Sequence, residues 1–273
     1  MATQPTLWFP AADPARTPSP WWYFGRAVYV SRRDYRRIFL AFVAAGAPFG
    51  VASVLLERPA LMRVPEAMAA IGVLMLTYSL AGLYRMYGHP SRRYIRQLID
   101  LAGVRCAVTV ADLHIGTYRH AFALAEALPD ATIHSIDCWS EAGDASELAV
   151  QDVRRLEPPP TGHERIVPGR ADHFHLPLPD ASCDVVVFGF GTHAIAAGAA
   201  RDTLFAEARR VLQGDGQVLL FEHGYDVHNY LIFGPVIDHV TRRDDWLATM
   251  RRIFTDVRYA RSSAAVDLIA ARR

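Results

Sequence analysis

The sequence predicts an α/β fold built around one βαβ unit and preceded by an N-terminal hairpin of two apolar helices. The βαβ unit is predicted within residues 108–140 (VTVADLHIGTYRHAFALAEALPDATIHSIDCWS), where short apolar runs flank an amphipathic helical pattern. The hairpin is predicted from two uncharged runs, Ile38–Leu56 and Ala67–Tyr84. Each run is near the length that crosses about 30 Å of hydrocarbon at about 1.5 Å per residue.

The βαβ unit carries the features of a nucleotide-type ligand site. A buried strand leads to Asp112, and a turn with Gly116 and Thr117 precedes the helix. A second strand (131–136) ends at an acidic residue, Asp137. Such a turn brings backbone amides and a helix N-terminus to a ligand, and an acid in this place can accept hydrogen bonds from ribose hydroxyls.

The turn does not have the three glycines of a dinucleotide fingerprint. It resembles motif I of class I S-adenosylmethionine-dependent methyltransferases, an acid-x-Gly-x-Gly-x-Gly run. Asp112 matches the acid, Gly116 matches the middle glycine, and His114 and Tyr118 replace the outer glycines. The resemblance implies that the His114 ring points at the methionyl group of the cofactor. The alternative is drift in a protein that no longer binds cofactor.

Two later runs are similar to the same family. Ala171-Asp172 and Leu176-Pro-Leu-Pro-Asp180 follow the A-D/E-x-x-x-L-P-x-P-D pattern, which implies that Asp172 lies near the adenine. The run EARRVLQGDGQVLLFEHG follows R-V-L-x-P-G-G-x-L-x-x-x-E. The resemblance covers Val104–Arg273 in order. It implies a Rossmann-like, seven-stranded class I methyltransferase core with helices on both faces and S-adenosyl-L-methionine as cofactor.

The cofactor-binding candidates lie in the motif I turn, at the ends of the second and fourth strands, and in the segment before the fourth. They are Asp112, His114, Gly116, Thr117, Asp137, Cys138, Asp172, His173 and Gly189. Methyl transfer needs no metal, and no clustered Asp, Glu and His ligand set stands out. Three scattered cysteines are too few for a disulfide framework or a zinc site.

The catalytic candidates follow the predicted fourth and fifth strands, because ligands of open α/β sheets bind beyond the carboxyl ends of the strands. They are His193, His223, Tyr225 and His228. The apolar segment Tyr230–Ile237 comes next, where this fold often builds its substrate pocket. Each histidine taken alone is also compatible with a solvated loop or a structural role.

The chain divides into four predicted parts. These are an N-terminal interfacial segment with four consecutive aromatic residues beside arginines (1–37), a two-helix membrane hairpin (38–87), an amphipathic linker helix (88–103) and the methyltransferase domain (104–273). Arginines before the first apolar run and after the second predict an inner (cytoplasmic) membrane location with the catalytic domain facing the cytoplasm. The alternative is a hairpin that is buried in a soluble fold or lies in the membrane plane.

The composition and this organisation narrow the function. A net charge of +1 argues against nucleic acid as a partner, and 51% hydrophobic residues is high for a soluble enzyme. A membrane hairpin joined to a small-molecule methyltransferase core predicts a lipid-like substrate and the membrane as partners, and a homodimer is left open. The architecture resembles the PhcB-type 3-hydroxy fatty acid carboxyl methyltransferases, which make fatty acid methyl ester signals for quorum sensing. The alternatives are a quinone or phospholipid methyltransferase, and a non-catalytic, membrane-tethered binding protein on a decayed methyltransferase fold.

Overall fold

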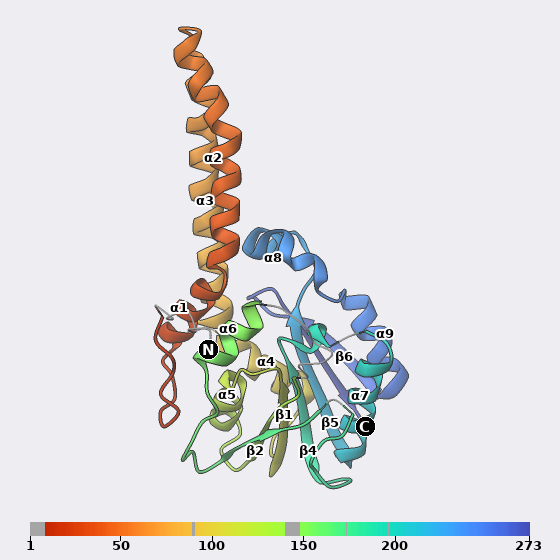
Figure 1. Cartoon of the computed structure of the whole chain (residues 1–273). Helices are drawn as coiled ribbons and strands as arrows, with labels where there is room; N and C mark the ends of the chain where they lie inside the picture. The colour runs from red at the N-terminus through yellow and green to blue at the C-terminus, as the bar shows by residue number, and fades with distance from the viewer. Residues whose placement is uncertain (1–8, 89–90, 140–147, 173, 196) are drawn as a thin grey trace.

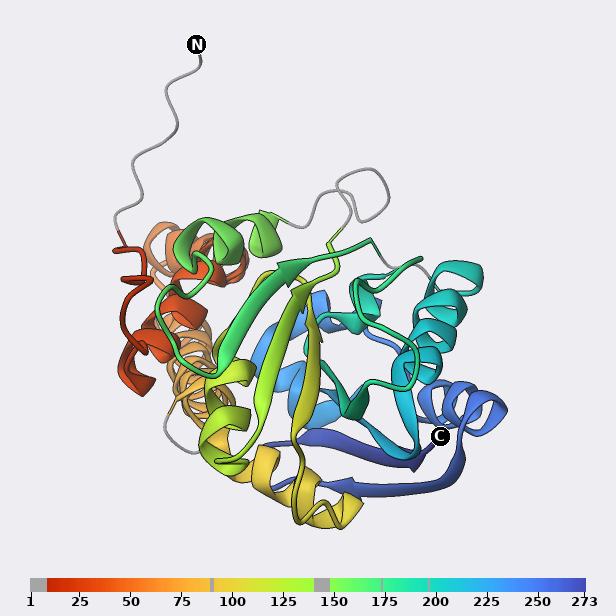
Figure 2. The same cartoon turned by 90° about the horizontal axis from the view of Figure 1, so that it is seen from below.

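A computed structural model describes residues 9–88, 91–139, 148–172, 174–195 and 197–273. In this part of the chain, seven strands form one sheet in the order β3-β2-β1-β4-β5-β7-β6 (Figure 2). The strands β1 to β5 are parallel to one another, whereas β7 runs antiparallel to both of its neighbours. The expected seven-stranded methyltransferase sheet is therefore confirmed. The strands are β1 (Thr109–His114), β2 (Thr132–Asp137), β3 (Ile166–Arg170), β4 (Cys183–Gly189), β5 (Leu212–His223), β6 (Thr255–Arg261) and β7 (Val266–Arg272).

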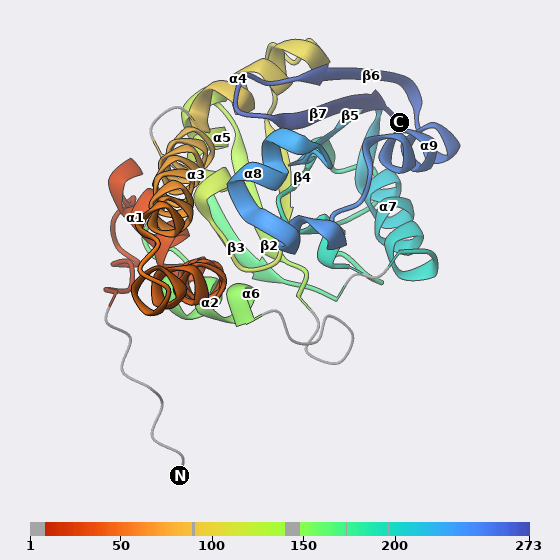
Figure 3. The ribbon, with the colours of Figure 1, turned by 90° about the horizontal axis from the view of Figure 1, so that it is seen from above.

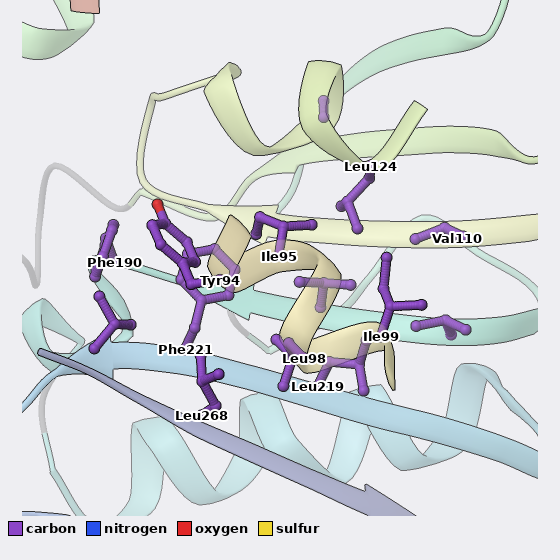
Figure 4. Close-up of a cluster of buried hydrophobic side chains, with 14 of the residues drawn as sticks. Tyr94, Ile95, Leu98, Ile99, Val110, Leu124, Phe190, Leu219, Phe221 and Leu268 are labelled. Atoms are coloured by element: carbon purple, nitrogen blue, oxygen red, sulfur yellow. The ribbon is translucent and has the colours of Figure 1, made fainter. Parts of the chain in front are cut away.

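Helices cover both faces of the sheet. On one face, α4 (Ser91–Ala102) and α5 (Arg119–Ala127) share a core with β1 and β5, in which Tyr94 and Leu98 of α4 pack near Phe221 (Figure 4). On the other face, α7 (Ala199–Val211) and α9 (Arg243–Ile253) bury Phe205 and Trp246. The remaining short helices are α6 (Leu148–Leu156), η2 (Thr192–Ala194), α8 (Val227–Phe233) and η3 (Gly234–His239).

Two long helices project from the α/β domain as a hairpin (Figure 1). They are α2 (Arg32–Leu55) and α3 (Arg63–Tyr87), joined through the 3-10 turn η1 (Pro59–Met62). The helix α2 continues through Pro48. Most hairpin side chains are exposed, and both helices are long and apolar enough to cross a membrane by length and composition. The spanning orientation stays a prediction.

The base of the hairpin is continuous with the domain core. Leu83 and Met86 at the end of α3 are buried in the same cluster as the sheet residues Val110 and Phe221. The preceding helix α1 (Pro20–Val30) adds Ala27 to this cluster. The boundaries drawn from the sequence at 37, 87 and 103 stay predictions, but the apolar core crosses all three.

Part of the predicted interfacial segment lies inside the protein. Tyr23 and Arg26 of α1 are 5% and 3% exposed, because both contact the buried carboxylate of Glu157. Trp21, by contrast, is 66% exposed. The expectation that the whole aromatic and arginine group faces a membrane is therefore wrong for Tyr23 and Arg26.

The first strand is longer than the sequence pattern predicted. The apolar run ends at Ala111, but β1 continues to His114, because Asp112–His114 pair with Ser135–Asp137 of β2. Two polar side chains at the carboxyl end of the sheet, Asp112 and His114, are thereby fixed by strand geometry rather than by a loop.

Candidate active site

A directional chain of hydrogen bonds fixes the end of β1. The backbone N–H of Gly116 donates to Nδ1 of His114 at 2.9 Å. The imidazole proton therefore resides on Nε2, which lies 3.0 Å from Ser135 Oγ, and Ser135 in turn donates to Asp112 Oδ2 at 3.0 Å. Burial lowers the pKa of His114 to about 4, so the ring is neutral. Both ring nitrogens thus bind protein, and a direct contact with the methionyl group stays a prediction.

Asp112 offers a buried carboxyl oxygen at the same place. Burial raises the pKa of Asp112 to about 7, although the Ser135 hydrogen bond opposes this shift. Its Oδ1 has no hydrogen-bond partner among the described residues. A buried polar atom without a partner is costly, so this oxygen fits a polar ligand group next to the turn.

Arg154 of α6 lies across the turn between β1 and α5 (residues 115–118), which is called the cofactor turn below. Its guanidinium contacts the Asp137 carboxylate at 2.7 Å and the Ile115 carbonyl at 3.2 Å. Gly116 has φ +109, and a Cβ there would come within 2.4 Å of Arg154 Cγ. The glycine is thus required both by the backbone conformation and by the close approach of Arg154.

The residues present fit S-adenosylmethionine on one condition. Asp137 stands where the ribose hydroxyls are expected, Asp112 supplies a buried oxygen, and Gly116 has no Cβ, so that only the Arg154 side chain occupies the space beside the turn. The condition is that Arg154 leaves Asp137, which a long side chain that is 20% exposed can do by rotation.

The other cofactor candidates have different local roles. Thr117 is buried and its hydroxyl donates to Glu157. Cys138 is buried in the apolar cluster that α7 and α9 form with the sheet. Asp172 is exposed, and its Oδ1 accepts two backbone N–H groups of its own loop at 2.9 Å. His173 lies outside the described residues, and Gly189 is required by the Phe221 ring, which a Cβ there would approach to 2.2 Å.

On the acceptor side, a buried carboxylate orients His193. Glu222 at the end of β5 is fully buried, and its Oε2 lies 2.8 Å from Nδ1 of His193. Its Oε1 accepts the backbone N–H groups of Gly191 and His193 at 3.2 and 3.3 Å. Burial alone would raise the pKa of Glu222, but His193 and these hydrogen bonds lower it to about 2. The carboxylate is therefore ionised and holds the His193 ring in one orientation.

His223 lies beside this pair. Its ring is stacked on Phe190 at 4.2 Å between centroids and lies 6.1 Å from the ring of His193. The hydroxyl of Tyr87, at the end of α3, is 3.2 Å from Nε2 of His223. Tyr87, a hairpin residue, thus contacts the pair His193 and His223, which is called the histidine group below.

The structure does not bring all four catalytic candidates together. His193 and His223 line one cavity. Tyr225 and His228 line a separate polar depression with Arg242 of the loop before α9. Tyr225 packs under the Arg242 guanidinium, and His228 hydrogen-bonds to Tyr78 of α3.

The cavity at His193 and His223 is large and mostly apolar. Its volume is about 1110 Å³, above the roughly 300–1,000 Å³ usual for small-molecule pockets. It is lined from the domain side by the two histidines and by Tyr230–Pro235, and along the hairpin by apolar residues of both helices. The hairpin residues include Ile38, Phe39, Phe42, Gly46, Met68, Gly72, Met75, Leu76 and Leu83.

Four site residues were missed in the sequence analysis. Glu222 could have been found, because it occupies the final acid of the R-V-L run. Arg154 and Glu157 carry no local signal: Arg154 lies on the short helix α6, and Glu157 follows this helix directly. Tyr87 lies three residues after the second uncharged run and was assigned only to the end of the predicted hairpin (38–87).

Comparison with known proteins agrees with this geometry. Residues 111–220 match the family described as "Methyltransferase domain". A SAM-dependent methyltransferase from Aquifex aeolicus has a similar structure, with a TM-score of 0.50 and 16% identity over 66% of this chain and 87% of that one. The pyocyanin biosynthetic protein PhzM has a TM-score of 0.50 and 17% sequence identity, over 70% of this chain and 57% of its own. A candidate O-methyltransferase from Nostoc punctiforme PCC 73102 has a TM-score of 0.50 and 17% sequence identity, over 73% of this chain and 60% of that one.

At these identities the structural similarities show the fold, and the last two proteins are matched over less than two thirds of their length. No curated protein matches the chain. The sheet order, the turn after β1 and the family match agree with one another. The chain contains a class I S-adenosylmethionine-dependent methyltransferase domain.

Proposed function

We propose that the protein is a membrane-associated enzyme that methylates the polar head of an amphiphile, the carboxylate of a fatty acid or 3-hydroxy fatty acid, to give a methyl ester. The observation that carries this proposal is the cavity, because it is lined both by the histidine group and by the apolar residues of the hairpin. A molecule that fills it has a polar end and a long apolar end.

The head of the acceptor would lie at His193 and His223. Nδ1 of His193 faces the ionised Glu222, so Nε2 is on the opposite side of the ring, and His193 lines the cavity. In this proposal His193 is protonated, and its Nε2–H binds the carboxylate of the acceptor by a charge-assisted hydrogen bond. The bound cofactor supplies an electrophilic methyl group, and a carboxylate acceptor needs orientation rather than deprotonation.

The tail of the acceptor would lie along the hairpin. Phe39, Phe42 and Leu76 line the cavity there, and burial of each methylene contributes about 0.8 kcal/mol. The same hairpin is expected to insert into the cytoplasmic membrane, since its outward side chains are apolar and exposed, as Val54, Leu55 and Leu74 illustrate. Arginines at its base favour the cytoplasmic side for the domain.

The direct test is an acceptor panel assayed with the full-length protein in detergent and labelled cofactor. We expect methyl transfer to long-chain fatty acids or their 3-hydroxy forms, and little to acids too short to enter the hairpin. Activity on phospholipids but not on free acids would replace this assignment. Cofactor binding without transfer to any amphiphile would favour the non-catalytic binding protein.

A hydroxyl acceptor, such as a quinol, is the second candidate. The observation that favours it is the contact between His193 and Glu222, which is how a carboxylate orients a general base. Neutral His193 would then take the hydroxyl proton. In that case the rate rises with pH as His193 loses its proton, whereas a carboxylate acceptor gives no such rise.

A further inference from the structure

A buried carboxylate accepts hydrogen bonds from the cofactor turn. Glu157, directly after α6, is 3% exposed. It accepts the backbone N–H of Tyr118 at 2.9 Å and the hydroxyl of Thr117 at 2.8 Å. Both donors lie in the turn between β1 and α5, so the shape of this turn depends on the position of Glu157.

The positive partner of Glu157 comes from outside the α/β domain. Arg26 of α1 pairs with Glu157, and its side chain is 4% exposed. Arg26 is the only arginine within ion-pair distance of Glu157 among the described residues. Tyr23, also in α1, donates to the same carboxylate at 3.3 Å. Loss of one partner of such a buried pair leaves an uncompensated charge, which the surrounding structure must accommodate.

The other end of the turn is attached to the N-terminal helices as well. Arg119, the first residue of α5, donates to the Met86 carbonyl at the end of α3 at 2.7 Å. It also donates to the hydroxyl of Tyr94 in α4 at 2.8 Å. Figure 3 shows α1, α3, α5 and α6 gathered on one side of the molecule. The cofactor turn is therefore held between elements that precede the methyltransferase domain in sequence.

We propose that Arg26 and Glu157 are positioning residues for S-adenosylmethionine, and that the helices before residue 91 complete the cofactor site. In this account α1 holds Glu157, and Glu157 holds the turn at Thr117 and Tyr118. Cofactor affinity and the docking of α1 are then linked, and each must strengthen the other to the same extent. Arg26 also lines the acceptor cavity, so this inference is tested by cofactor binding in the absence of any acceptor.

The test measures binding of S-adenosylhomocysteine to the full-length protein in detergent by titration calorimetry. Arg26→Gln is expected to weaken binding at least tenfold, and Arg26→Lys to restore most of it. Arg32→Gln is the matched control, because Arg32 pairs with the buried Asp152 of α6 at 2.8 Å but does not reach the turn. We expect less than a twofold change in the control.

A second readout separates positioning from general stability. Glu157→Gln should raise KM for the cofactor and leave KM for the acceptor unchanged, because Glu157 does not line the acceptor cavity, whereas Arg26 does. Equal losses of affinity in Arg26→Gln and Arg32→Gln, or a lower melting temperature with unchanged affinity, would overturn the proposal.

If Arg26→Gln does not fold, the double variant Arg26→Met with Glu157→Leu decides. Apolar residues of similar size can replace a buried ion pair without loss of stability. This variant should therefore fold, yet bind S-adenosylhomocysteine at least tenfold more weakly, because Thr117 and Tyr118 have lost their acceptor. Wild-type affinity in the double variant would overturn the proposal.

Discussion

The substitution Gly72→Leu tests whether the acceptor tail occupies the hairpin part of the cavity. Gly72 lies in α3 and lines the cavity, and a Cβ there would be 3.8 Å from Phe42 Cδ1, an ordinary contact. Fifteen residues of helix separate Gly72 from Tyr87 at the histidine group, a distance of about 22 Å. A leucine side chain should therefore block the far part of the cavity and leave the head site unchanged.

The magnitude follows from the excluded methylenes. A leucine side chain has four carbons and would displace about four methylenes of a long tail, worth about 3 kcal/mol at about 0.8 kcal/mol each. KM for the longest accepted acid should then rise on the order of 100-fold, whereas KM for acids that end before Gly72 should not change. The assay is KM as a function of acyl chain length.

The control is Ala70→Leu, which adds apolar atoms to the same helix at an exposed position outside the cavity lining. It should leave the chain-length profile unchanged. The placement of the tail would be refuted if Gly72→Leu left the dependence of KM on chain length unaltered, or if it raised KM equally for short and long acids.

Three further predictions concern the domain itself. Asp137→Ala should weaken cofactor binding by about 1–3 kcal/mol in calorimetry, because a charge-assisted ribose contact is lost, and unchanged affinity would place the ribose elsewhere. Glu222→Gln should destabilise the protein by about 3 kcal/mol at pH 7, since the pKa of Glu222 is lowered from 4.5 to about 2. That contribution is complete above pH 4.5 and is lost as the pH falls towards 2, so the difference in melting temperature from the wild type should narrow over this range; a constant difference would contradict it. The pKa of His114 is lowered from 6.5 to about 4, so the unfolded chain takes up a proton that the folded protein refuses, and the contribution of His114 to stability should fall by about 3 kcal/mol between pH 6.5 and 4, while the raised pKa of Asp112 acts in the opposite direction. His114→Gln should remove that part of the pH dependence, and an unchanged melting profile would count against a neutral, buried imidazole.

The fold was predictable because its signals are local. The amphipathic pattern of the predicted linker helix (88–103) contains α4, which runs over Ser91–Ala102, and the acid after the second strand predicted the βαβ unit. Each of these signals lies within a few dozen residues and depends on which side chains are apolar.

The site was less predictable because its contacts join distant parts of the chain. Arg26 and Glu157 are 131 residues apart, and Tyr87 and His223 are 136 apart. No periodic pattern indicates that such residues meet. The reason for Gly189 was also hidden, because the Phe221 ring that requires it lies on the neighbouring strand.

The separation of Tyr225 and His228 from His193 has a similar cause. All of them follow strand ends, as the sequence suggested, but α8 begins at Val227 and turns the chain toward the hairpin. His228 consequently contacts Tyr78 of α3, and Tyr225 packs against Arg242.

The chemical lability of the transferred methyl group tests the proposed function most directly. Full-length protein would be incubated with methyl-labelled S-adenosylmethionine and a long-chain 3-hydroxy fatty acid, and the extracted lipid product treated with mild alkali. We predict that the label appears in the organic phase and that alkali releases it as methanol, as for a methyl ester. A label that stays on the lipid after alkali would indicate an ether formed at a hydroxyl group and would contradict the assignment of the carboxylate as acceptor.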